Sequence, residues 1–373
     1  MVSMLKSLFN YNNTYINNMY VNNFENYNKV LEVVPLKEEQ IIIKKFDMNC
    51  DLITTVKQFC ETTLNSYTKK YIVSLSGGVD SMVLITILKI LNYQVVACHI
   101  NYNNREETNV EQAFLEYWCH SNAIKLYVKS ITNIKRKNTK RSDYEYESKK
   151  IRFDFYKEIM TKEESDFILL AHHKDDIIEN IFANVCRGRY ILDLAVIKEQ
   201  SIINGVIILR PLIDLYKSSI ISFASKYDVP YFKDSTPLWS VRGKFRTKIY
   251  PLLEDTFSYN IKSNLLGLSN QAYEWNELVL QQIIEPFLAL VIYEEIKCVF
   301  NVEKYNSHPL CFWNIIFMKL FYRYNYNCPS RKAIQVFMNA IKTQNCGLIS
   351  LSDNCTCKNK NYEITINFNF NVK

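Results

Sequence analysis

The fold class follows from residues 71–91, which read YIVSLSGGVDSMVLITILKIL. Residues 71–75 form a short apolar run that predicts a β-strand, and the apolar run at 82–91 predicts a buried helix. The six residues between them include two adjacent glycines, in a chain of 373 residues that has only seven glycines. We therefore expect a tight turn from strand to helix, in the place where open α/β sheets bind their ligands.

Short apolar strands and helices continue to alternate outward from this turn. The alternation predicts a doubly wound parallel sheet with helices on both faces, formed by residues 48–255. The expected strands are 71–75, 94–100, 124–128, 167–171 and 206–209. The expected helices are 46–66, 82–91, 109–121, 144–161, 175–186 and 218–227.

The pattern changes after Pro251. Residues 256–373 predict a smaller, mainly helical domain with a small β element. Its expected elements are helices at 261–284, 312–322 and 330–342 and a strand at 362–370, and Pro286 should break or kink the chain after the first helix. Residues 1–47 are polar and rich in asparagine and tyrosine, so we expect an accessory N-terminal segment.

Composition and charge limit the classes of protein that fit. A hydrophobic fraction of 48% and a charged fraction of 22% are typical of a globular protein, and a net charge of +7 allows an anionic partner. The sequence shows no secretory signal and no apolar run that would cross a membrane, so we expect a cytoplasmic protein without a membrane partner. The 11 cysteines form no Cys-x-x-Cys pair and are expected to be reduced thiols.

The turn itself, Ser-Gly-Gly-Val-Asp-Ser at 76–81, predicts a phosphate-binding site. Paired glycines let the backbone approach a phosphate closely, and the start of a helix directs N–H groups and a positive dipole end at an anion. Asp80 can hold Mg²⁺. The residues that we expect to bind a nucleotide are Ser76, Gly77, Gly78, Val79, Asp80 and Ser81. The alternative is a glycine turn in which Asp80 and Ser81 merely cap the helix.

A second polar group follows the fourth expected strand, at residues 171–180, which read AHHKDDIIEN. Two adjacent histidines and three acids at the carboxyl end of a strand favour a catalytic site over a structural role. Asp176 and Glu179 lie three residues apart and should share a helix face. We predict Asp175, Asp176 and Glu179 as catalytic residues, with Asp176 as a second magnesium ligand beside Asp80.

Basic residues gather in two further stretches, 135–141 and 242–248. Arginine suits bidentate phosphate contacts and stacking on bases, and Phe245 lies within the second stretch. The alternative in each case is a solvated basic surface. The residues that we expect to contact nucleic acid are Lys135, Arg136, Lys137, Arg141, Arg152, Arg242, Lys244 and Arg246.

Taken in order, these stretches resemble the tRNA(Ile)-lysidine synthetase family, a group of PP-loop ATP pyrophosphatases of the N type. The matching motifs are residues 76–81, His99 with Asn101 and Arg105, Glu145 to Phe153, His172 to Glu179, Arg187-Gly188, Arg210-Pro211-Leu212, and Arg242 with Arg246 ahead of Pro251. The main departures from the family pattern are Tyr102 for histidine, Asn180 for threonine and Gly243 for asparagine; Lys149 and Phe153 are conservative replacements, and the glycine pattern after Gly188 is lost. The resemblance spans residues 71–253.

The resemblance implies an ATP-dependent carbon–nitrogen ligase. Members adenylate cytidine at the first anticodon position of tRNA and release pyrophosphate, and the amine of lysine then displaces AMP. ATP would contact residues 76–81, His99 and Arg187, with Mg²⁺ on Asp80 and Asp176. The second domain would help to bind tRNA, and a homodimer is allowed.

The resemblance leaves several roles open. Arg246 or Arg187 would stabilise the charge on the phosphoryl group, and one acid among Asp175, Asp176 and Glu179 would hold or deprotonate the amine. Two rival functions also stay open. One is another PP-loop enzyme that modifies tRNA, for example by 2-thiolation, and the other is a catalytically inactive homologue that only binds tRNA.

Overall fold

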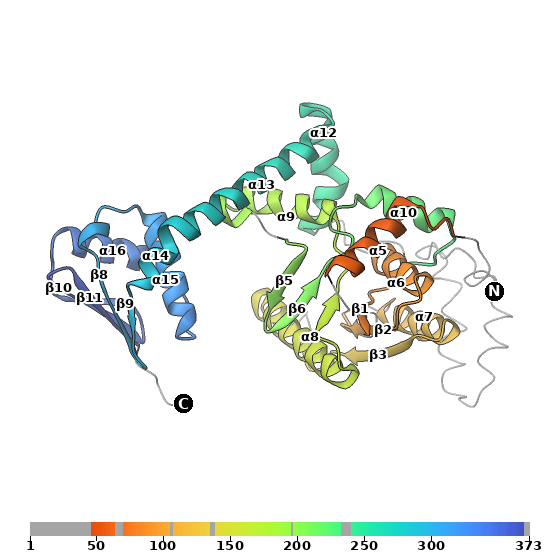
Figure 1. The fold of residues 1–373 in the computed structure, drawn as a ribbon, viewed down its shortest axis with the longest axis horizontal. Coiled ribbons are helices and arrows are strands. Elements are labelled where there is room, and N and C mark those ends of the chain that lie inside the picture. Colours follow the sequence, from red (N-terminus) through yellow and green to blue (C-terminus); the bar gives the residue numbers. More distant parts are fainter. Residues whose placement is uncertain are drawn as a thin grey trace. The chain divides into compact units, whose positions relative to one another are not determined.

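A computed structural model gives the fold and describes residues 46–63, 70–104, 107–134, 139–194, 197–232 and 240–368. The chain divides into two compact units, each of which is considered by itself (Figure 1). The described residues of the first unit fall within 1–183 and 196–266, and those of the second within 184–195 and 267–373. Within the described ranges, no helix is long and apolar enough to cross a membrane.

The first unit is built on a six-stranded sheet with the strand order β3-β2-β1-β4-β6-β5 (Figure 1). Its strands are β1 (Tyr71–Ser74), β2 (Val95–Asn101), β3 (Lys125–Ser130), β4 (Phe167–Leu169), β5 (Gln200–Ile203) and β6 (Val206–Leu209). All neighbouring pairs are parallel except β5 and β6, which are antiparallel. The predicted doubly wound sheet is confirmed, and its strand order reverses between β1 and β4.

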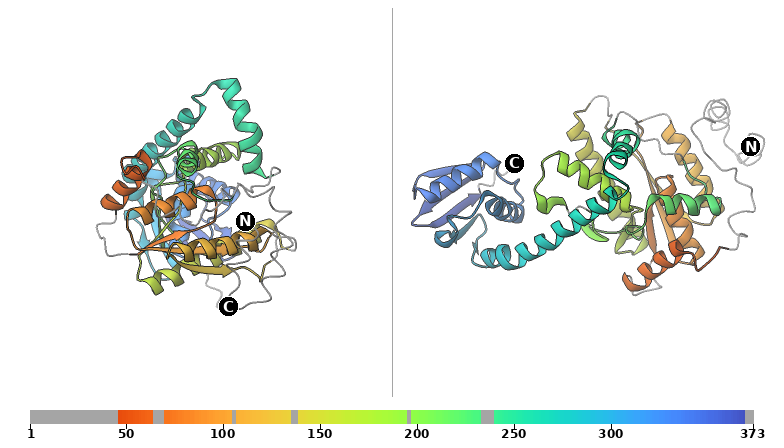
Figure 2. Two further views of the ribbon diagram at one scale, coloured as in Figure 1. Left: turned by 90° about the vertical axis from the view of Figure 1, so that its right-hand side faces the viewer. Right: turned by 90° about the horizontal axis from the view of Figure 1, so that it is seen from above.

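Helices cover both faces of this sheet (Figure 1, Figure 2). They are α5 (Asp51–Thr63), α6 (Val79–Ile90), α7 (Glu107–Ser121), α8 (Arg141–Glu163), α9 (Lys174–Cys186) and α10 (Lys217–Lys226). One hydrophobic cluster joins α5, α6, α7 and α10 to the sheet, and a separate cluster joins α8 to it. Val73 of β1 belongs to the first cluster and Ile72 to the second, so β1 is buried on both faces. This explains why the strand is a continuous apolar run.

The first unit ends in short helices that the sequence did not predict. They are α11 (Val241–Lys244), a π-helix (Phe245–Ile249) and α12 (Tyr250–Phe257), and they lead into α13 (Ile261–Val279), which lies within the helix expected at 261–284. The hydroxyl of Ser240 accepts a hydrogen bond from the Gly243 N–H at 2.9 Å and caps α11. Single π-turns are rare and often lie at functional sites, and this one carries Arg246.

The second unit contains a five-stranded antiparallel sheet with the order β7-β8-β11-β10-β9. Its strands are β7 (Ile292–Tyr293), β8 (Lys297–Asn301), β9 (Leu348–Ser352), β10 (Cys355–Lys360) and β11 (Glu363–Phe368). The sequence predicted only the last of these strands. In β10 the buried face is formed by Cys355, Cys357 and Asn359, so the strand lacks the aliphatic alternation that would reveal it.

The helices of the second unit follow the sequence more closely. They are α14 (Glu285–Ala289), α15 (Leu310–Arg323) and α16 (Arg331–Lys342), with short 3₁₀ turns at Ile191–Leu194 and Glu303–Tyr305. Helix α13 passes through a π-turn (Leu280–Ile284) into α14. Pro286 lies in the first turn of α14, where its missing amide hydrogen is not needed.

Candidate active site at the carboxyl edge of the parallel sheet

The two predicted motifs meet because β1 and β4 are neighbours in the sheet. Val73 of β1 pairs with Leu169 of β4. The turn at residues 76–81 follows β1 directly, and His172 and His173 follow β4. Both motifs therefore lie at the carboxyl edge, at the reversal of strand order where open sheets form a crevice for ligands.

The turn at 76–81 is closed by its own serines and requires a glycine. The hydroxyl of Ser81 lies 3.0 Å from that of Ser76 and donates to the Gly78 carbonyl at 3.0 Å. Gly77 has a φ of +86°, and a Cβ atom there would lie 2.9 Å from a ring carbon of Phe232. No described side chain caps the start of α6 at Gly78. The first N–H groups of that helix therefore favour an anion.

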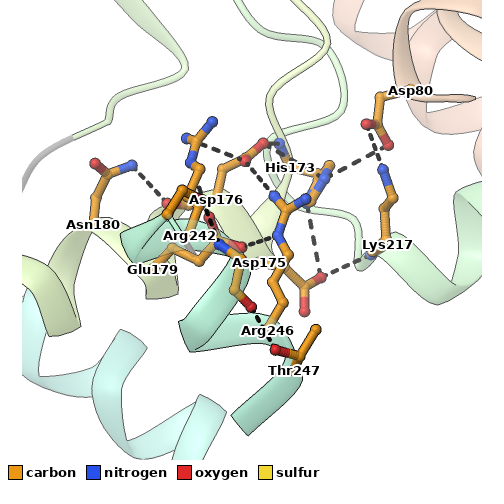
Figure 3. Close-up of polar contacts among 12 residues, drawn as sticks. Asp80, His173, Asp175, Asp176, Glu179, Asn180, Lys217, Arg242, Arg246 and Thr247 are labelled. Carbon is orange, nitrogen blue, oxygen red and sulfur yellow. Dashed lines mark hydrogen bonds and ion pairs between the residues drawn. The ribbon is translucent and has the colours of Figure 1, made fainter. Parts of the chain in front are cut away.

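His173 lies among three aspartates (Figure 3). Its side chain is only 2% exposed, and Nε2 lies 3.5 Å from both Asp80 Oδ1 and Asp176 Oδ2. Its Nδ1 lies 3.7 Å from Asp175 Oδ2. Asp80 Oδ1 is buried and has no hydrogen-bond partner among the described residues. The fold thus gathers three of the predicted carboxylates around one imidazole ring and leaves an oxygen open to a ligand.

Both oxygens of Asp175 are occupied. The Lys217 N–H donates to Oδ2 at 2.8 Å, and the Lys262 ammonium donates to Oδ1 at 2.6 Å. Burial alone would raise the pKa of Asp175, but these two donors outweigh it and the pKa lies below its ordinary value. Lys262 Nζ also lies 4.6 Å from the centre of the Tyr250 ring. Asp175 therefore joins the starts of α10 and α13 to α9.

Lys217 connects this aspartate to the turn after β1. Its ammonium donates to Asp80 Oδ2 at 2.5 Å, although the two residues are 137 positions apart (Figure 3). The turn at 76–81 has no lysine of its own, and Lys217 brings a cation to it from the start of α10. Lys217 was not among the site residues predicted from the sequence. Its only signal was a place at the start of a helix that follows a strand of the sheet.

Two arginines bracket Glu179 (Figure 3). Arg246 Nε donates to Oε1, and Arg242 Nε lies 3.1 Å from Oε2. The Nη2 atoms of Arg242 and Arg246 lie 3.6 and 3.7 Å from Asp176 Oδ1. Asn180 donates instead to the Asp176 carbonyl at 2.7 Å, within its own helix. The two acids thus contact the same pair of arginines, as their spacing of three on α9 requires.

His172 is held by the buried Arg210, which was not predicted as a site residue. Arg210 is 4% exposed, and its Nε donates to His172 Nδ1 at 3.1 Å. Its Nη1 donates to the Lys198 carbonyl at 2.6 Å and to Ser201 Oγ at 2.8 Å. Because a guanidinium only donates, the ring proton of His172 must lie on Nε2. Burial, reinforced by Arg210, lowers the pKa of His172 to about 4, so the ring is neutral at pH 7.

His99 supports the turn from β2. It is buried, and its Nδ1 lies 2.8 Å from the Leu75 carbonyl, immediately before Ser76. A carbonyl only accepts, so Nδ1 carries the proton and Nε2 is an acceptor without a hydrogen-bond partner in the described part of the chain. Burial lowers the pKa of His99.

Other predicted residues lie away from these contacts. Lys135, Arg136 and Lys137 lie outside the described residues. Arg187 is exposed and belongs to the second unit. Arg141 is exposed and pairs with Glu145 at 2.8 Å, and Lys244 is exposed on α11. Arg152 is partly buried on α8.

A comparison with protein-family models identifies the family to which this fold belongs. A family model described as a PP-loop domain matches residues 48–253, which is more than half of the chain. This chain belongs to the PP-loop family. Its PP-loop was predicted from the turn at 76–81, and that family membership is confirmed.

Individual relatives of this PP-loop protein cover different shares of its length. A tRNA(Ile)-lysidine synthase from Bacteroides thetaiotaomicron is 30% identical over 204 residues, which are 54% of this chain and 47% of the relative. A tRNA(Ile)-lysidine synthase from Chlamydia felis is 29% identical over 238 residues, 63% of this chain and 74% of the relative. The chain thus spans about half of the first relative. Among solved structures, a U34-tRNA thiolase from Methanococcus maripaludis matches with a TM-score of 0.47 and 18% identity, over 62% of this chain and 78% of that one.

Proposed function

We propose that this PP-loop protein is a tRNA(Ile)-lysidine synthetase-type ligase. It would use ATP to adenylate cytidine at the first anticodon position of tRNA, and the amine of lysine would then displace AMP. The observation that carries the proposal is the junction of the turn at 76–81 with the carboxylates around His173. Relatives named tRNA(Ile)-lysidine synthase support the choice of substrates. Since tRNA is used in the cytoplasm, the reaction would take place there.

The nucleotide phosphates would bind at Gly77 and Gly78. The uncapped start of α6 offers backbone N–H groups to an anion, and the positive φ of Gly77 brings the backbone close to it. Lys217 adds a cation beside Asp80, in the role that a lysine within the loop has in other phosphate loops. We assign Lys217 to the triphosphate.

The carboxylates fit a magnesium ion. Asp80 offers a buried oxygen without a hydrogen-bond partner in the described ranges, and Asp176 approaches the same His173 nitrogen. No group of three or more His, Cys, Asp or Glu side chains among the described residues could hold a metal by itself. Mg²⁺ is usually bound by one or two carboxylates together with substrate phosphates, which matches Asp80 and Asp176. When bound, it would neutralise charge on the phosphates.

The first step would join the cytosine carbonyl oxygen to the α-phosphorus and break the bond to the β-phosphate oxygen. Charge grows on the α-phosphoryl oxygens, and preorganised cations stabilise it. Glu179 accepts a hydrogen bond from Arg246 Nε and forms an ion pair with Arg242, so it orients the Arg246 guanidinium and keeps the second arginine beside it. We assign charge stabilisation to Arg246 and a positioning role to Glu179.

In the second step the lysine amine would attack the adenylated ring carbon, AMP would leave, and the amine would lose a proton. Asp175 has both oxygens occupied by Lys217 and Lys262. Asp176 Oδ1 lies 3.6 and 3.7 Å from the arginine nitrogens, and an incoming amine can replace such long contacts. We therefore assign the proton acceptor to Asp176 and a positioning role to Asp175.

The RNA would be held by the basic stretches. Arg242 and Lys244 are exposed on α11, and Arg242 contacts the carboxylate cluster. Each basic side chain that binds a phosphate should, when it is replaced, reduce the salt slope of tRNA binding by about 0.7–0.9. Replacing Lys135 and Arg136 by glutamate tests the other stretch in the same way.

The decisive experiment incubates the purified protein with tRNA, γ-labelled and α-labelled ATP, and labelled lysine. We expect tRNA-dependent release of pyrophosphate and AMP together with lysine in the tRNA, and mass spectrometry of the nucleosides would locate it. Pyrophosphate release without lysine incorporation would identify another PP-loop enzyme with a different co-substrate. Tight tRNA binding without either product would identify an inactive binding homologue.

A further inference from the structure

Helix α8 carries a row of polar side chains at a spacing of four residues. The row comprises Tyr144, Ser148, Arg152 and Tyr156. Side chains four residues apart lie on neighbouring turns of one helix face, about 6 Å apart along the axis. Tyr144 is 8% exposed and Ser148 is 7% exposed, so these hydroxyls are buried against the body of the first unit.

The contacts of α8 show which end of the row lies near the PP-loop. At the end of α8, Glu163 binds Lys70, just before β1, and Lys125, the first residue of β3. These residues mark the amino edge of the sheet. Tyr156 lies 2.7 Å from the hydroxyl of Ser74, the last residue of β1. The helix therefore runs antiparallel to β1, and its residues before Tyr156 extend past the carboxyl edge, where the PP-loop begins two residues after Ser74.

Three successive members of the row bury polar atoms that have no hydrogen-bond partner within the described ranges. These atoms are Tyr144 Oη, Ser148 Oγ and Arg152 Nε. Tyr156, at the sheet itself, has its partner in Ser74. Burying three polar groups in this way is costly and rare in native proteins, unless a ligand satisfies them in use. An arginine Nε–H only donates, and both hydroxyls can donate, so the matching ligand is an oxyanion.

We propose that Arg152, Ser148 and Tyr144 bind the carboxylate of the amino-acid co-substrate. The inference rests on the proposed ligase function and extends it to the recognition of lysine. Lysine has two amines, and fixing its carboxylate at α8 would leave the side-chain amine to reach the adenylated base. Buried donors suit a small carboxylate better than an RNA phosphate, because the phosphates of a folded RNA stay at the protein surface.

The test compares lysine with cadaverine, which keeps the chain and amine but lacks the carboxylate. In the full-length protein with tRNA and ATP, Arg152→Met should raise the KM for lysine about tenfold or more and leave kcat within about threefold. The KM for cadaverine should change less than about twofold. Ser148→Ala and Tyr144→Phe should each give a smaller increase of the same kind. Lys150→Met, an exposed residue on the same helix, is the matched control and should leave both KM values unchanged.

Melting temperatures separate binding from a structural role. Because Ser148 and Tyr144 lack partners in the described part of the fold, their apolar replacements should leave the melting temperature unchanged or raise it. Equal increases in KM for lysine and cadaverine would overturn the carboxylate contact. A weaker ATP or tRNA affinity with an unchanged KM for lysine would also overturn it, in favour of a phosphate. If the wild-type protein released pyrophosphate but transferred neither amine to tRNA, the proposed ligase function would fail. Calorimetric titration of lysine into the wild-type protein and into the Arg152→Met variant would still show whether the row on α8 binds the carboxylate.

Discussion

Two charged clusters lie at opposite edges of the same parallel sheet, and they differ in how completely their polar atoms are paired. At the amino edge, Glu163 has a side chain only 2% exposed. It accepts from Lys70 at 2.7 Å, from Lys125 at 2.6 Å and from the Tyr127 hydroxyl at 2.6 Å. Burial alone would raise the pKa of Glu163, but its three donors outweigh burial and lower the pKa to about 2.

At the carboxyl edge the pairing is incomplete. Asp80 Oδ1 and His173 Nδ1 are buried without hydrogen-bond partners in the described part of the chain. The ring nitrogens of His173 lie 3.5 to 3.7 Å from the nearest aspartate oxygens. The amino-edge carboxylate therefore stabilises the fold, whereas the unpaired atoms of the carboxyl-edge cluster support the proposal that ligands bind there. Four substitutions test this difference, in order of the expected change in free energy.

Asp80→Asn should have the largest effect. It removes the charge that would face Mg²⁺ and the phosphates in the proposed reaction but keeps an oxygen that can accept from Lys217. We expect pyrophosphate release to fall about 10³-fold, or about 4 kcal/mol, and urea unfolding to change by less than about 1 kcal/mol. Pyrophosphate release within about threefold of wild type would remove the PP-loop from the reaction. A large loss of stability would make this cluster structural, like the one at the other edge.

Gly77→Ala should cost less in catalysis and more in folding. The new side chain would meet Phe232 at 2.9 Å in a backbone with a φ of +86°. We expect a loss of about 2–3 kcal/mol in stability and at least about tenfold in pyrophosphate release, because the loop must shift. The matched control is Gly205→Ala, which has a φ of +76° but only Lys157 at 3.8 Å. It should cost about 1 kcal/mol in stability and leave the reaction unchanged. Equal effects of the two variants on pyrophosphate release would contradict the special role of the loop.

Glu163→Gln should lower the stability and leave the reaction unchanged, which is the reverse of the effect expected for Asp80→Asn. The partners Lys70 and Lys125 are 42% and 61% exposed, so solvent screens the contacts, and we expect a loss of about 2 kcal/mol in stability. Pyrophosphate release per folded molecule should not change. Glu158→Gln is the matched control on the same helix, since Glu158 makes an exposed pair with Lys162. It should leave the stability nearly unchanged, because solvent screens the pair.

The pH dependence of the Glu163→Gln comparison has a definite sign. The pKa of Glu163 is about 2 in the folded protein against an ordinary value of 4.5, so its contribution is fully present above about pH 4.5. The contribution is lost as the pH falls from 4.5 toward 2. The stability difference between wild type and Glu163→Gln should therefore shrink over that window in urea titrations. A constant difference would mean that the carboxylate is not the source of the stability.

The same contrast shows what could be predicted from the sequence. The parallel sheet and the family were predicted correctly, because strands buried on both faces are continuous apolar runs and the PP-loop is a short local motif. The edge strand β5, which reads QSII, was missed because it is antiparallel, polar at its start and half exposed. In the second unit, four of the five strands were missed for a similar reason.

The long-range contacts at the site could not be predicted from local sequence patterns. Lys217 reaches Asp80 across 137 residues, and Lys262 reaches Asp175 across 87. Spacing places Asp175 and Asp176 side by side on α9, and only the fold reveals that Asp175 is fully paired. The predicted roles of these residues stay predictions.

Arg210→Gln should have the smallest effect. It tests a residue that supports the carboxyl-edge cluster through its contact with His172. Arg210 is itself fully buried and well paired, so it resembles the amino-edge cluster in its contacts but acts on His172. Without the guanidinium, His172 loses the donor that keeps its proton on Nε2, and its pKa should rise from about 4, although burial, the largest cause of the low pKa, still opposes the charged form. We expect pyrophosphate release to fall about fivefold at pH 7, or about 1 kcal/mol, and to fall further toward pH 6 as the ring gains a proton. In the wild-type protein His172 stays neutral over that range, so its activity should not show this additional loss. If the pH–rate profiles of the two proteins were parallel, Arg210 would serve only the packing of the sheet edge. Its role would then be structural, like that of Glu163, and not catalytic.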